Sequence, residues 1–288
     1  MAYPLMEHLI GKGFLYCGKY YRVRSELTES LQKPVDIRIY YETVRVKDGV
    51  LLFVEDHLQR LVNSVKGLEN FPVNTSSILA EAYSFIDMDG IKDGSIRIVL
   101  TKEVLLIHQA DISIPTEEQF ENGINTSILN WERKTPNLKI FRGDYKTTVN
   151  EKFKQENEHG LPFELVLTDN EGRLYEGSMS NLFVIRDGKV YSAPDNKILI
   201  GITRKRVMEA LKRSGLELQI GTFKPEELDP AKDAVFVSST PFDILPVRYM
   251  DGYEFRSSDN EILKMISKMY KEYTSEYIGA AKRALTGQ

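Results

Sequence analysis

The sequence predicts an α+β fold in two domains, and three observations lead to that expectation. The chain has 288 residues, which is enough for one large or two modest domains. Short runs of β-branched and aromatic residues, some joined by Asp-Gly turns, alternate with amphipathic helical segments. The polar segment 113–122, which contains Pro115, interrupts this rhythm. We therefore expect a first domain at 1–113, a linker at 114–122 and a second domain at 123–288.

Composition and charge indicate an ordinary soluble globular protein. Hydrophobic residues make up 42% and charged residues 28% of the chain. The formal net charge is −4 without a long basic block, so nucleic-acid binding has little support. Cys17 is the single cysteine, which excludes an intrachain disulfide and fits a reducing compartment. Neither a signal-peptide core nor an apolar run of about 20 residues is present, so we expect a cytoplasmic protein outside the membrane.

The first domain is expected to combine a hairpin, two helices and two further strands. Residues 37–46 favour a strand, and Asp48-Gly49 turns the chain into a second strand, VLLFV. A second helix is expected in ILAEAYSFI, and the strands GSIRIVLT and EVLLIHQADI complete the domain. Residues 1–35 hold no clear period. The helix after the hairpin places apolar residues on one face: Leu58, Leu61, Val62, Val65 and Leu68.

The second domain is expected to hold short strands and three helices. A strand is expected in GINTSILNWER, followed by an irregular segment with Pro136 and Gly143 as breakers. A helix is expected from about 147 to 158. The runs FELVLTD, RLYEG, NLFVIRD and KVYSA then predict strands separated by turns. The later elements are a helix at 203–215, a buried strand at 234–240 and a last helix at about 260–283.

Lys146 precedes the helix expected at 147–158. In the simplest interpretation it is a solvated lysine near a helix start, and this holds for most lysines. In the functional interpretation its amine attacks and holds the carbonyl of an electrophilic cofactor. The four histidines are scattered and show no metal-ligand spacing, so no metal site is expected.

Glu176 lies in an apolar neighbourhood between the runs LVL, LY and NLFVI. It could be a surface charge on an edge strand, since strand side chains alternate between two faces. It could also be a carboxylate that pairs with a pyridinium nitrogen and keeps such a ring protonated. Gly177 would let a backbone come close to a ligand.

Three groups of residues suggest a phosphate site. Gly201-Ile202-Thr203 begins an amphipathic helix, where Thr203 could simply be the N-cap or could join free backbone N–H groups around a phosphate. Ser238-Ser239-Thr240 ends a buried strand and could add hydroxyls, although such clusters are often turn residues. Arg60 lies at the margin of a buried helical face and could bind phosphate through two N–H groups.

These stretches resemble the class IV fold of pyridoxal-phosphate enzymes. That family includes branched-chain aminotransferases, D-amino acid aminotransferases and aminodeoxychorismate lyases. The resemblance rests on YETVRVKDG followed by HLQRL, on LYEGSMSNLFVIRDGKVYSAP followed by ILIGITRKRV, and on VSSTPFDILPV. It covers about residues 40–70 and 140–250. It implies a small N-terminal α/β sandwich, a larger C-terminal pseudo-barrel α/β domain and a cofactor between them.

The resemblance also implies roles for individual residues. Lys146 would hold pyridoxal 5'-phosphate as a Schiff base and move the substrate's α-proton. Glu176 would pair with the pyridine nitrogen, Leu199 would pack on the ring, and Tyr41 and Arg97 would lie close to the substrate. Relatives are homodimers in which the partner chain helps to close the site. The cofactor set implied is Arg60, Lys146, Glu176, Ser180, Asn181, Leu199, Gly201, Ile202, Thr203, Ser239 and Thr240.

The expected function is a pyridoxal-phosphate-dependent aminotransferase acting on an amino acid and a 2-keto acid. Two alternatives stay open. One is a lyase of the aminodeoxychorismate type that releases pyruvate, with which Thr43 is compatible. The other is a non-catalytic cofactor-binding or structural homodimer, motivated by the segment PVDIRIY, which lacks the glycines that relatives carry there.

Overall fold

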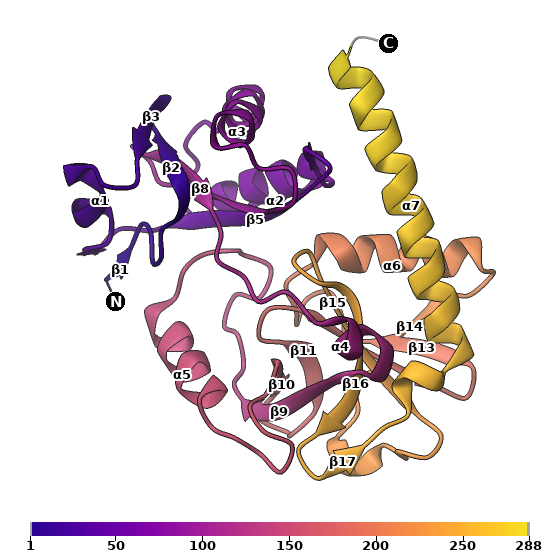
Figure 1. Ribbon diagram of the computed structural model, residues 1–288. Helices are drawn as coiled ribbons and strands as arrows, with labels where there is room; N and C mark the ends of the chain where they lie inside the picture. The colour runs from indigo at the N-terminus through magenta and orange to yellow at the C-terminus, as the bar shows by residue number, and fades with distance from the viewer. Residues whose placement is uncertain (1, 287–288) are drawn as a thin grey trace. The chain divides into compact units, whose positions relative to one another are not determined.

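The computed structural model describes residues 2–286, and the chain forms two compact units within it. Unit 1 comprises residues 2–113, 138–146 and 274–286, and unit 2 comprises residues 114–137 and 147–273 (Figure 1). The domain boundaries predicted from the sequence stay a prediction. The structure adds that later parts of the chain, far from residue 113, also belong to the first unit.

Unit 1 is built on a six-stranded sheet of order β3-β2-β8-β7-β5-β6, in which the neighbouring strands pair antiparallel. The hairpin expected at Asp48-Gly49 is confirmed, because Asp48 and Gly49 both have positive φ and join β5 to β6. The strands are β2 (Ile10–Tyr16), β3 (Lys19–Arg22), β5 (Tyr40–Lys47), β6 (Val50–Leu51), β7 (Gly94–Leu100) and β8 (Leu105–Gln109).

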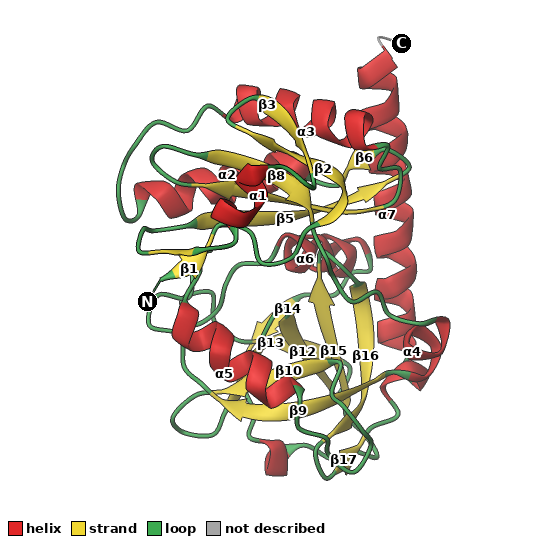
Figure 2. Cartoon of the chain, turned by 60° about the vertical axis from the view of Figure 1, so that its left-hand side comes forward, coloured by secondary structure: helices red, strands yellow, loops and turns green. Residues whose placement is uncertain are grey.

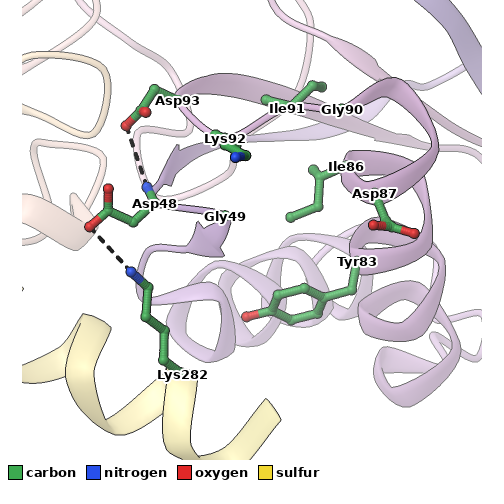
Figure 3. Close-up of a pocket in the computed structure, with 10 residues that line it drawn as sticks. All are labelled: Asp48, Gly49, Tyr83, Ile86, Asp87, Gly90, Ile91, Lys92, Asp93 and Lys282. Atoms are coloured by element: carbon green, nitrogen blue, oxygen red, sulfur yellow. Dashed lines mark hydrogen bonds and ion pairs between the residues drawn. The ribbon is translucent and has the colours of Figure 1, made fainter. Parts of the chain in front are cut away.

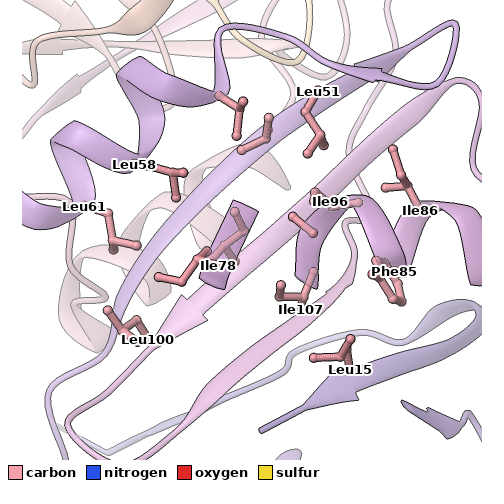
Figure 4. Packing of buried hydrophobic residues seen from close by; sticks show 14 of the residues in the cluster. Leu15, Leu51, Leu58, Leu61, Ile78, Phe85, Ile86, Ile96, Leu100 and Ile107 are labelled. Carbon is pink, nitrogen blue, oxygen red and sulfur yellow. The ribbon is translucent and has the colours of Figure 1, made fainter. Parts of the chain in front are cut away.

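Helices α2 (Val54–Lys66) and α3 (Thr75–Asp89) contribute to a core with one face of this sheet. In α2 the predicted apolar face is confirmed where Leu58, Leu61 and Val65 are buried. Asn74 is the N-cap of α3, and its side chain accepts a hydrogen bond from the Ser77 N–H at 3.0 Å. Figure 4 shows the helix side chains meeting those of the strands.

The N-terminal residues of unit 1 belong to a second apolar cluster. Strand β1 (Tyr3–Pro4) pairs with β4 (Pro34–Val35), and helix α1 (Glu26–Leu31) ends in the buried Leu31. Leu5 and Met6 are buried in the same cluster as Val99 of β7. The sequence had predicted no element in this part of the chain, because each of these pieces is short and their apolar residues follow no single period.

Unit 2 contains a nine-stranded sheet of order β11-β10-β9-β16-β15-β12-β13-β14, with β17 paired to β16. Strand β11 also pairs with β12, so six of these strands close into a small barrel-like ring (Figure 2). The strands are β9 (Ile124–Asn130), β10 (Glu164–Thr168), β11 (Leu174–Gly177), β12 (Asn181–Arg186), β13 (Lys189–Ser192), β14 (Leu218–Ile220), β15 (Ala234–Ser239), β16 (Asp243–Met250) and β17 (Tyr253–Glu254).

The remaining helices include two that belong to both units. Helices α5 and α7 each begin in one unit and end in the other. None of the helices described in residues 2–286 combines the length and apolar character needed to cross a membrane. The helices are α4 (Glu117–Asn122), α5 (Gly143–Phe153), α6 (Ile202–Arg213) and α7 (Glu261–Thr286), with short 3₁₀ turns at η1 (Pro225–Glu227) and η2 (Ser257–Asp259).

Helix α5 starts and ends earlier than predicted. Gly143, which the sequence suggested as a breaker, is its first residue, so Lys146 lies inside the helix rather than before it. Asp144 in the first turn is favourable at a helix N-terminus. The helix ends at Phe153, and the amide of Asn157 donates to Thr126 O at 3.1 Å and to Ser127 Oγ at 3.0 Å. These bonds tie the side chain of Asn157 to β9 four residues after the helix has ended.

Two further expectations are corrected. Gly201 is the N-cap of α6 and makes no side-chain cap, so Thr203 is a helical residue and not the cap. The strand expected at VLLFV ends at Leu51, and Val54 already begins α2 with Glu55 and Asp56 in its first turn. Strand β16 was not predicted, because Pro246 favours an irregular segment although it pairs with Phe236 here.

Candidate functional site

Lys146 lies in the first turn of α5, where its backbone N–H donates to Arg142 O at 3.0 Å. Its side chain is one-third exposed, at 33%. Its Nζ atom lies 3.6 Å from Oε1 of Glu7, which comes from the N-terminal segment of the same unit. The amine is therefore accessible and has one carboxylate near it.

Aromatic rings and Arg97 surround this carboxylate. Phe141 stacks on Tyr41 at 4.0 Å and on Tyr3 at 4.6 Å between ring centroids. Arg97 lies over the rings of Tyr41 and Phe141 at 5.6 and 5.7 Å and donates to Oε2 of Glu7 at 3.1 Å. The structure thus brings together Lys146, Tyr41 and Arg97, the three candidate residues that the sequence placed on the catalytic and substrate side.

Arg60 is held by a buried carboxylate on the other face of strand β5. Its Nε donates to Oε1 of Glu42 at 2.8 Å, and its Nη2 donates to Oε2 at 2.6 Å. Nδ1 of the buried His57 lies 2.7 Å from the same carboxylate. Burial alone would raise the pKa of Glu42, but Arg60 and His57 outweigh it and lower the pKa to about 2. Alternation along β5 places Glu42 and Tyr41 on opposite faces.

In unit 2, Glu176 is the buried acid that the sequence suggested. Its side chain is 1% exposed, which excludes the surface interpretation. Oε1 forms an ion pair with Nε of Arg133 at 2.8 Å, and Oε2 accepts a hydrogen bond from the Leu199 N–H at 3.1 Å. The carboxylate is thus paired with a cation through one oxygen and with a backbone N–H through the other.

Leu199 is held on both sides of its backbone. Glu176 binds its N–H, and Nδ2 of Asn181 donates to its carbonyl at 2.9 Å. Glu176 and Asn181 are register partners across β11 and β12, so the two bonds come from one rigid pair of strands. A Cβ atom added at Gly201 would lie 2.0 Å from Oδ1 of Asn181. Glycine is therefore required where this segment enters α6.

Ile202 and Thr203, where the sequence suggests an anion site, are the first two residues of α6. The first backbone N–H groups of a helix have no acceptor within it and attract anions. At the C-terminal end of β15, the Ser239 hydroxyl donates to Met179 O at 2.7 Å, and Thr240 is the next residue along the chain. Among residues 2–286, the buried Ser238 hydroxyl has no hydrogen-bond partner.

A second buried acid, Glu164, supports the loop that carries Ser180. Oε1 accepts from the Ser178 N–H at 3.1 Å and from the Ser178 hydroxyl at 2.6 Å, and Oε2 accepts from the Met179 N–H at 3.3 Å. Burial raises the pKa of Glu164, although these donors lower it in part. A Cβ atom at Gly177 would lie 2.0 Å from Oγ of Ser180, so the loop packs tightly here.

The donor set fits a phosphorylated pyridine-type cofactor. Unit 2 offers a buried carboxylate for a ring N–H and, three residues after Leu199, a helix N-terminus for a dianion. At Gly201, directly before that helix, the backbone packs against the Asn181 side chain with no room for a Cβ atom. Unit 1 offers the accessible amine of Lys146 and the guanidinium of Arg60. The chemistry of these groups is complementary to an aldehyde, a pyridinium and a phosphate.

Several residues in these settings were missed by the sequence reasoning. Glu7 and Tyr3 lie in a segment without periodicity, and Phe141 lies in a segment expected to be irregular. Arg133 stands among charged residues in WERKTP, where no pattern marks it as the partner of a buried acid. Glu164 follows Phe163 in a strand of five buried residues, and a lone charge in such a buried run was the one available signal.

A separate hollow in unit 1 holds none of the candidate residues. It lies between the Asp48-Gly49 turn, helix α3 and the end of α7 (Figure 3). Nζ of Lys282 approaches Oδ2 of Asp48 at 3.4 Å, and the Asp48 N–H donates to Asp93 at 3.4 Å. Asp48 thus pairs with both Lys282 and Asp93 in the lining of this hollow.

Comparison with known proteins identifies the family. The family model for amino-transferase class IV matches residues 40–250. The D-alanine aminotransferase of Bacillus licheniformis is 24% identical over 231 residues, which cover 74% of this chain and 78% of that protein. The aminodeoxychorismate lyase of Bacillus subtilis is 24% identical over 247 residues, covering 81% and 84%.

A solved structure shows the same fold. The T.th. branched-chain amino acid aminotransferase, complexed with N-(5'-phosphopyridoxyl)-L-glutamate, has a TM-score of 0.75 at 19% identity. The match covers 93% of this chain and 96% of that one. The family model alone spans more than half of the 288 residues, including β5 and the whole run from Glu176 to Thr240. The chain belongs to the class IV aminotransferase family.

Proposed function

We propose that this protein is a pyridoxal-phosphate-dependent aminotransferase that moves an amino group between an amino acid and a 2-keto acid. The observation that carries the proposal is the bond from the Leu199 N–H to the buried Glu176 carboxylate, three residues before α6. An acid and an anion-binding helix end are thereby fixed on one segment. The membership in class IV and the phosphopyridoxyl ligand of the solved relative support the same cofactor.

Pyridoxal phosphate, when bound, supplies a protonated ring that accepts the electron pair released at the substrate's α-carbon. Glu176 would hold the proton at the ring nitrogen by accepting its hydrogen bond, and its ion pair with Arg133 would keep the carboxylate in position. Leu199 would place its apolar side chain against the ring, with its backbone held by Glu176 and Asn181. Glu176, Arg133 and Leu199 would bind and orient the cofactor ring, and none of them has to move a proton.

Lys146 is the residue that we propose moves the proton. Its Nζ atom would hold the cofactor covalently at rest and be displaced by the substrate amine. The freed amine would then take a proton from the α-carbon and return it to the cofactor's C4′ carbon. An accessible side chain on a regular helix suits this role, because the backbone is fixed while the four-carbon stem can turn.

The remaining cofactor residues would bind the phosphate. We propose that the N–H groups of Ile202 and Thr203 and the hydroxyls of Thr203 and Thr240 donate to its oxygens. The Ser239 hydroxyl would donate there too, after giving up its bond to Met179 O. Arg60 would add its positive charge while Glu42 fixes its side chain. Ser180 and Gly201 would keep the surrounding loops in place, since an added Cβ would clash at Gly201 and at the glycine before Ser178.

On the substrate side we propose Tyr41 and Arg97, which lie within one cluster with Lys146 in unit 1. We also propose that the protein works as a homodimer in the cytoplasm. The exposed Cys17, which forms no disulfide, suits a reducing compartment. Light scattering of the purified chain tests the dimer, and a monomer at all concentrations would contradict it.

One alternative function has a specific observation in its favour. Thr43 of β5 lies directly opposite Arg97 of β7, so a hydroxyl faces the proposed substrate side. One of the relatives is an aminodeoxychorismate lyase. A lyase of that type would release pyruvate from its substrate by elimination and would need no keto acid.

The deciding experiment is an amino-donor panel, both enantiomers included, assayed with and without a 2-keto acid. An aminotransferase consumes donor only when an acceptor is present and forms the matching keto acid and amino acid. Pyruvate from aminodeoxychorismate without an acceptor would favour the lyase. A cofactor absorption band without turnover of any substrate, unchanged by Lys146→Ala, would favour a binding protein.

A further inference from the structure

The N-terminal segment of unit 1 delivers a carboxylate to the surroundings of Lys146. This segment is anchored: β1 pairs with β4, Met6 is 1% exposed, and its N–H donates to Leu31 O at 3.2 Å. Glu7 directly follows the buried Met6. Its position is therefore set by packing and main-chain bonds.

Glu7 uses both carboxylate oxygens. Oε2 accepts a hydrogen bond from Nη1 of Arg97 at 3.1 Å, and Oε1 accepts one from the Tyr3 hydroxyl. Oε1 also lies 3.6 Å from Nζ of Lys146. The side chains of Glu7 and Arg97 are 17% and 16% exposed, so water screens this pair only in part. Burial would raise the pKa of Glu7, but Lys146, Tyr3 and Arg97 together hold it below its ordinary value.

Glu7 is the carboxylate that pairs with Arg97 within residues 2–286. Arg97 faces the ring of Tyr41 and that of Phe141, which carry no charge. His108 of β8 lies opposite Arg97, and burial together with Arg97 lowers the pKa of His108 to about 4, so it is neutral at pH 7. The positive charge of Arg97 is thus balanced from within the chain.

We propose that Glu7 determines the charge selectivity of the reaction by occupying Arg97. This inference rests on the proposed function, in which Lys146 holds the cofactor. Arg97 and the amine of Lys146 contact the same carboxylate, so without Glu7 this guanidinium would attract a second carboxylate on a substrate. With Glu7 in place, that carboxylate meets an anion, so diacids are disfavoured and amino acids with uncharged side chains are preferred.

The test compares isosteric pairs that differ in one charge. For catalysis the pair is glutamine and glutamate, in the enantiomer that the enzyme uses. For equilibrium binding the pair is 5-amino-5-oxopentanoate and glutarate, titrated into the holoprotein by calorimetry. In Glu7→Gln, we expect glutarate to bind about tenfold more tightly, while the mono-amide changes less than about twofold. The ratio of kcat/KM for glutamate over glutamine should rise by a similar factor.

Two controls isolate the charge at residue 7. Glu103→Gln removes one charge from an exposed position of the same unit and should leave both ratios unchanged. Glu7→Asp keeps the charge on a shorter stem and should retain the discrimination against glutarate. Circular dichroism and the melting temperature verify that each variant is folded.

The outcomes separate the inference from the proposed function. If Glu7→Gln forms the cofactor band and binds both ligands with unchanged selectivity, the inference is wrong while the proposed function stands. An equal gain or loss for glutarate and the mono-amide also overturns it. If the wild type forms no cofactor band at all, the proposed function itself has failed.

Discussion

At the scale of single residues, three glutamates show how surroundings give one side chain three tasks. Glu42 is buried with Arg60 and His57, Glu164 binds donors from its own loop, and Glu176 lies between Arg133 and a backbone N–H. Only Glu176 was singled out from the sequence, because LYEGSMSN carries it in a recognisable order. The roles of Glu42 and Glu164 could not be predicted, because they depend on partners that no local pattern indicates. Arg60, the partner of Glu42, is 18 residues away in sequence.

The first prediction concerns the buried pair of Glu42 and Arg60. Glu42→Gln leaves the guanidinium without its counter-charge in a site where Glu42 is 0% and Arg60 12% exposed. We expect the free energy of unfolding to fall by about 3 kcal/mol. Urea denaturation measures it, with Glu103→Gln as the exposed control. A loss no larger than that of the control would contradict the stabilising role.

The pair also predicts a pH dependence of stability. The pKa of Glu42 is about 2 in the folded chain against an ordinary value of 4.5, so its contribution is complete above pH 4.5. That contribution is lost as the pH falls from 4.5 towards 2. Urea midpoints should therefore drop more steeply across this range for the wild type than for Glu42→Gln. Parallel curves would contradict this assignment.

A third prediction addresses Glu176. Glu176→Gln keeps the size but removes the charge that would hold a proton on the ring nitrogen. We expect turnover to fall about 100-fold or more. The melting temperature should fall as well, because Arg133 loses its counter-charge just as Arg60 does in Glu42→Gln. Glu171→Gln is the matched control, because Glu171 is 77% exposed in the neighbouring turn. Equal turnover in the two variants would contradict the role of Glu176.

At the scale of elements, the sequence predicted the type of most helices and strands but not where some begin. The strands from β10 to β13 follow from β-branched runs and turn residues, and they are confirmed. The starts of α5 and α6 were wrong, because a glycine is the first residue of α5 and the N-cap of α6, and Gly201 has no capping side chain. The hydrogen bonds that fix the Leu199 backbone could not be predicted from the sequence, because they depend on the register of β11 with β12.

The entry into α6 gives the prediction at this scale. In Gly201→Ala the new Cβ would lie 2.0 Å from Oδ1 of Asn181, so the bond from Asn181 to Leu199 must shift. We expect the dissociation constant for pyridoxal phosphate to rise about tenfold. Gly252→Ala is the control, because nothing lies within 4 Å of its added Cβ. Fluorescence titration measures the constant, and equal values in both variants would contradict the account.

At the scale of the whole molecule, the α+β class was predictable and the make-up of the units was not. Residues 138–146 join the first unit through bonds such as Phe141 N–H to Ile39 O at 3.0 Å. The end of α7 does so through Tyr277, whose hydroxyl donates to Glu55 at 2.8 Å. No local pattern announces contacts across about 100 or more residues. Such long returns bring Lys146, Glu7 and Arg97 into one unit.

The central claim is that Lys146 carries the cofactor. The protein, loaded with pyridoxal phosphate, is reduced with borohydride, digested and examined by peptide mass spectrometry, with Lys146→Ala as the control. We predict a phosphopyridoxyl group on the peptide that contains Lys146 and on no other lysine. Labelling of a different lysine, or no labelling of a chain that has taken up the cofactor, would contradict the claim.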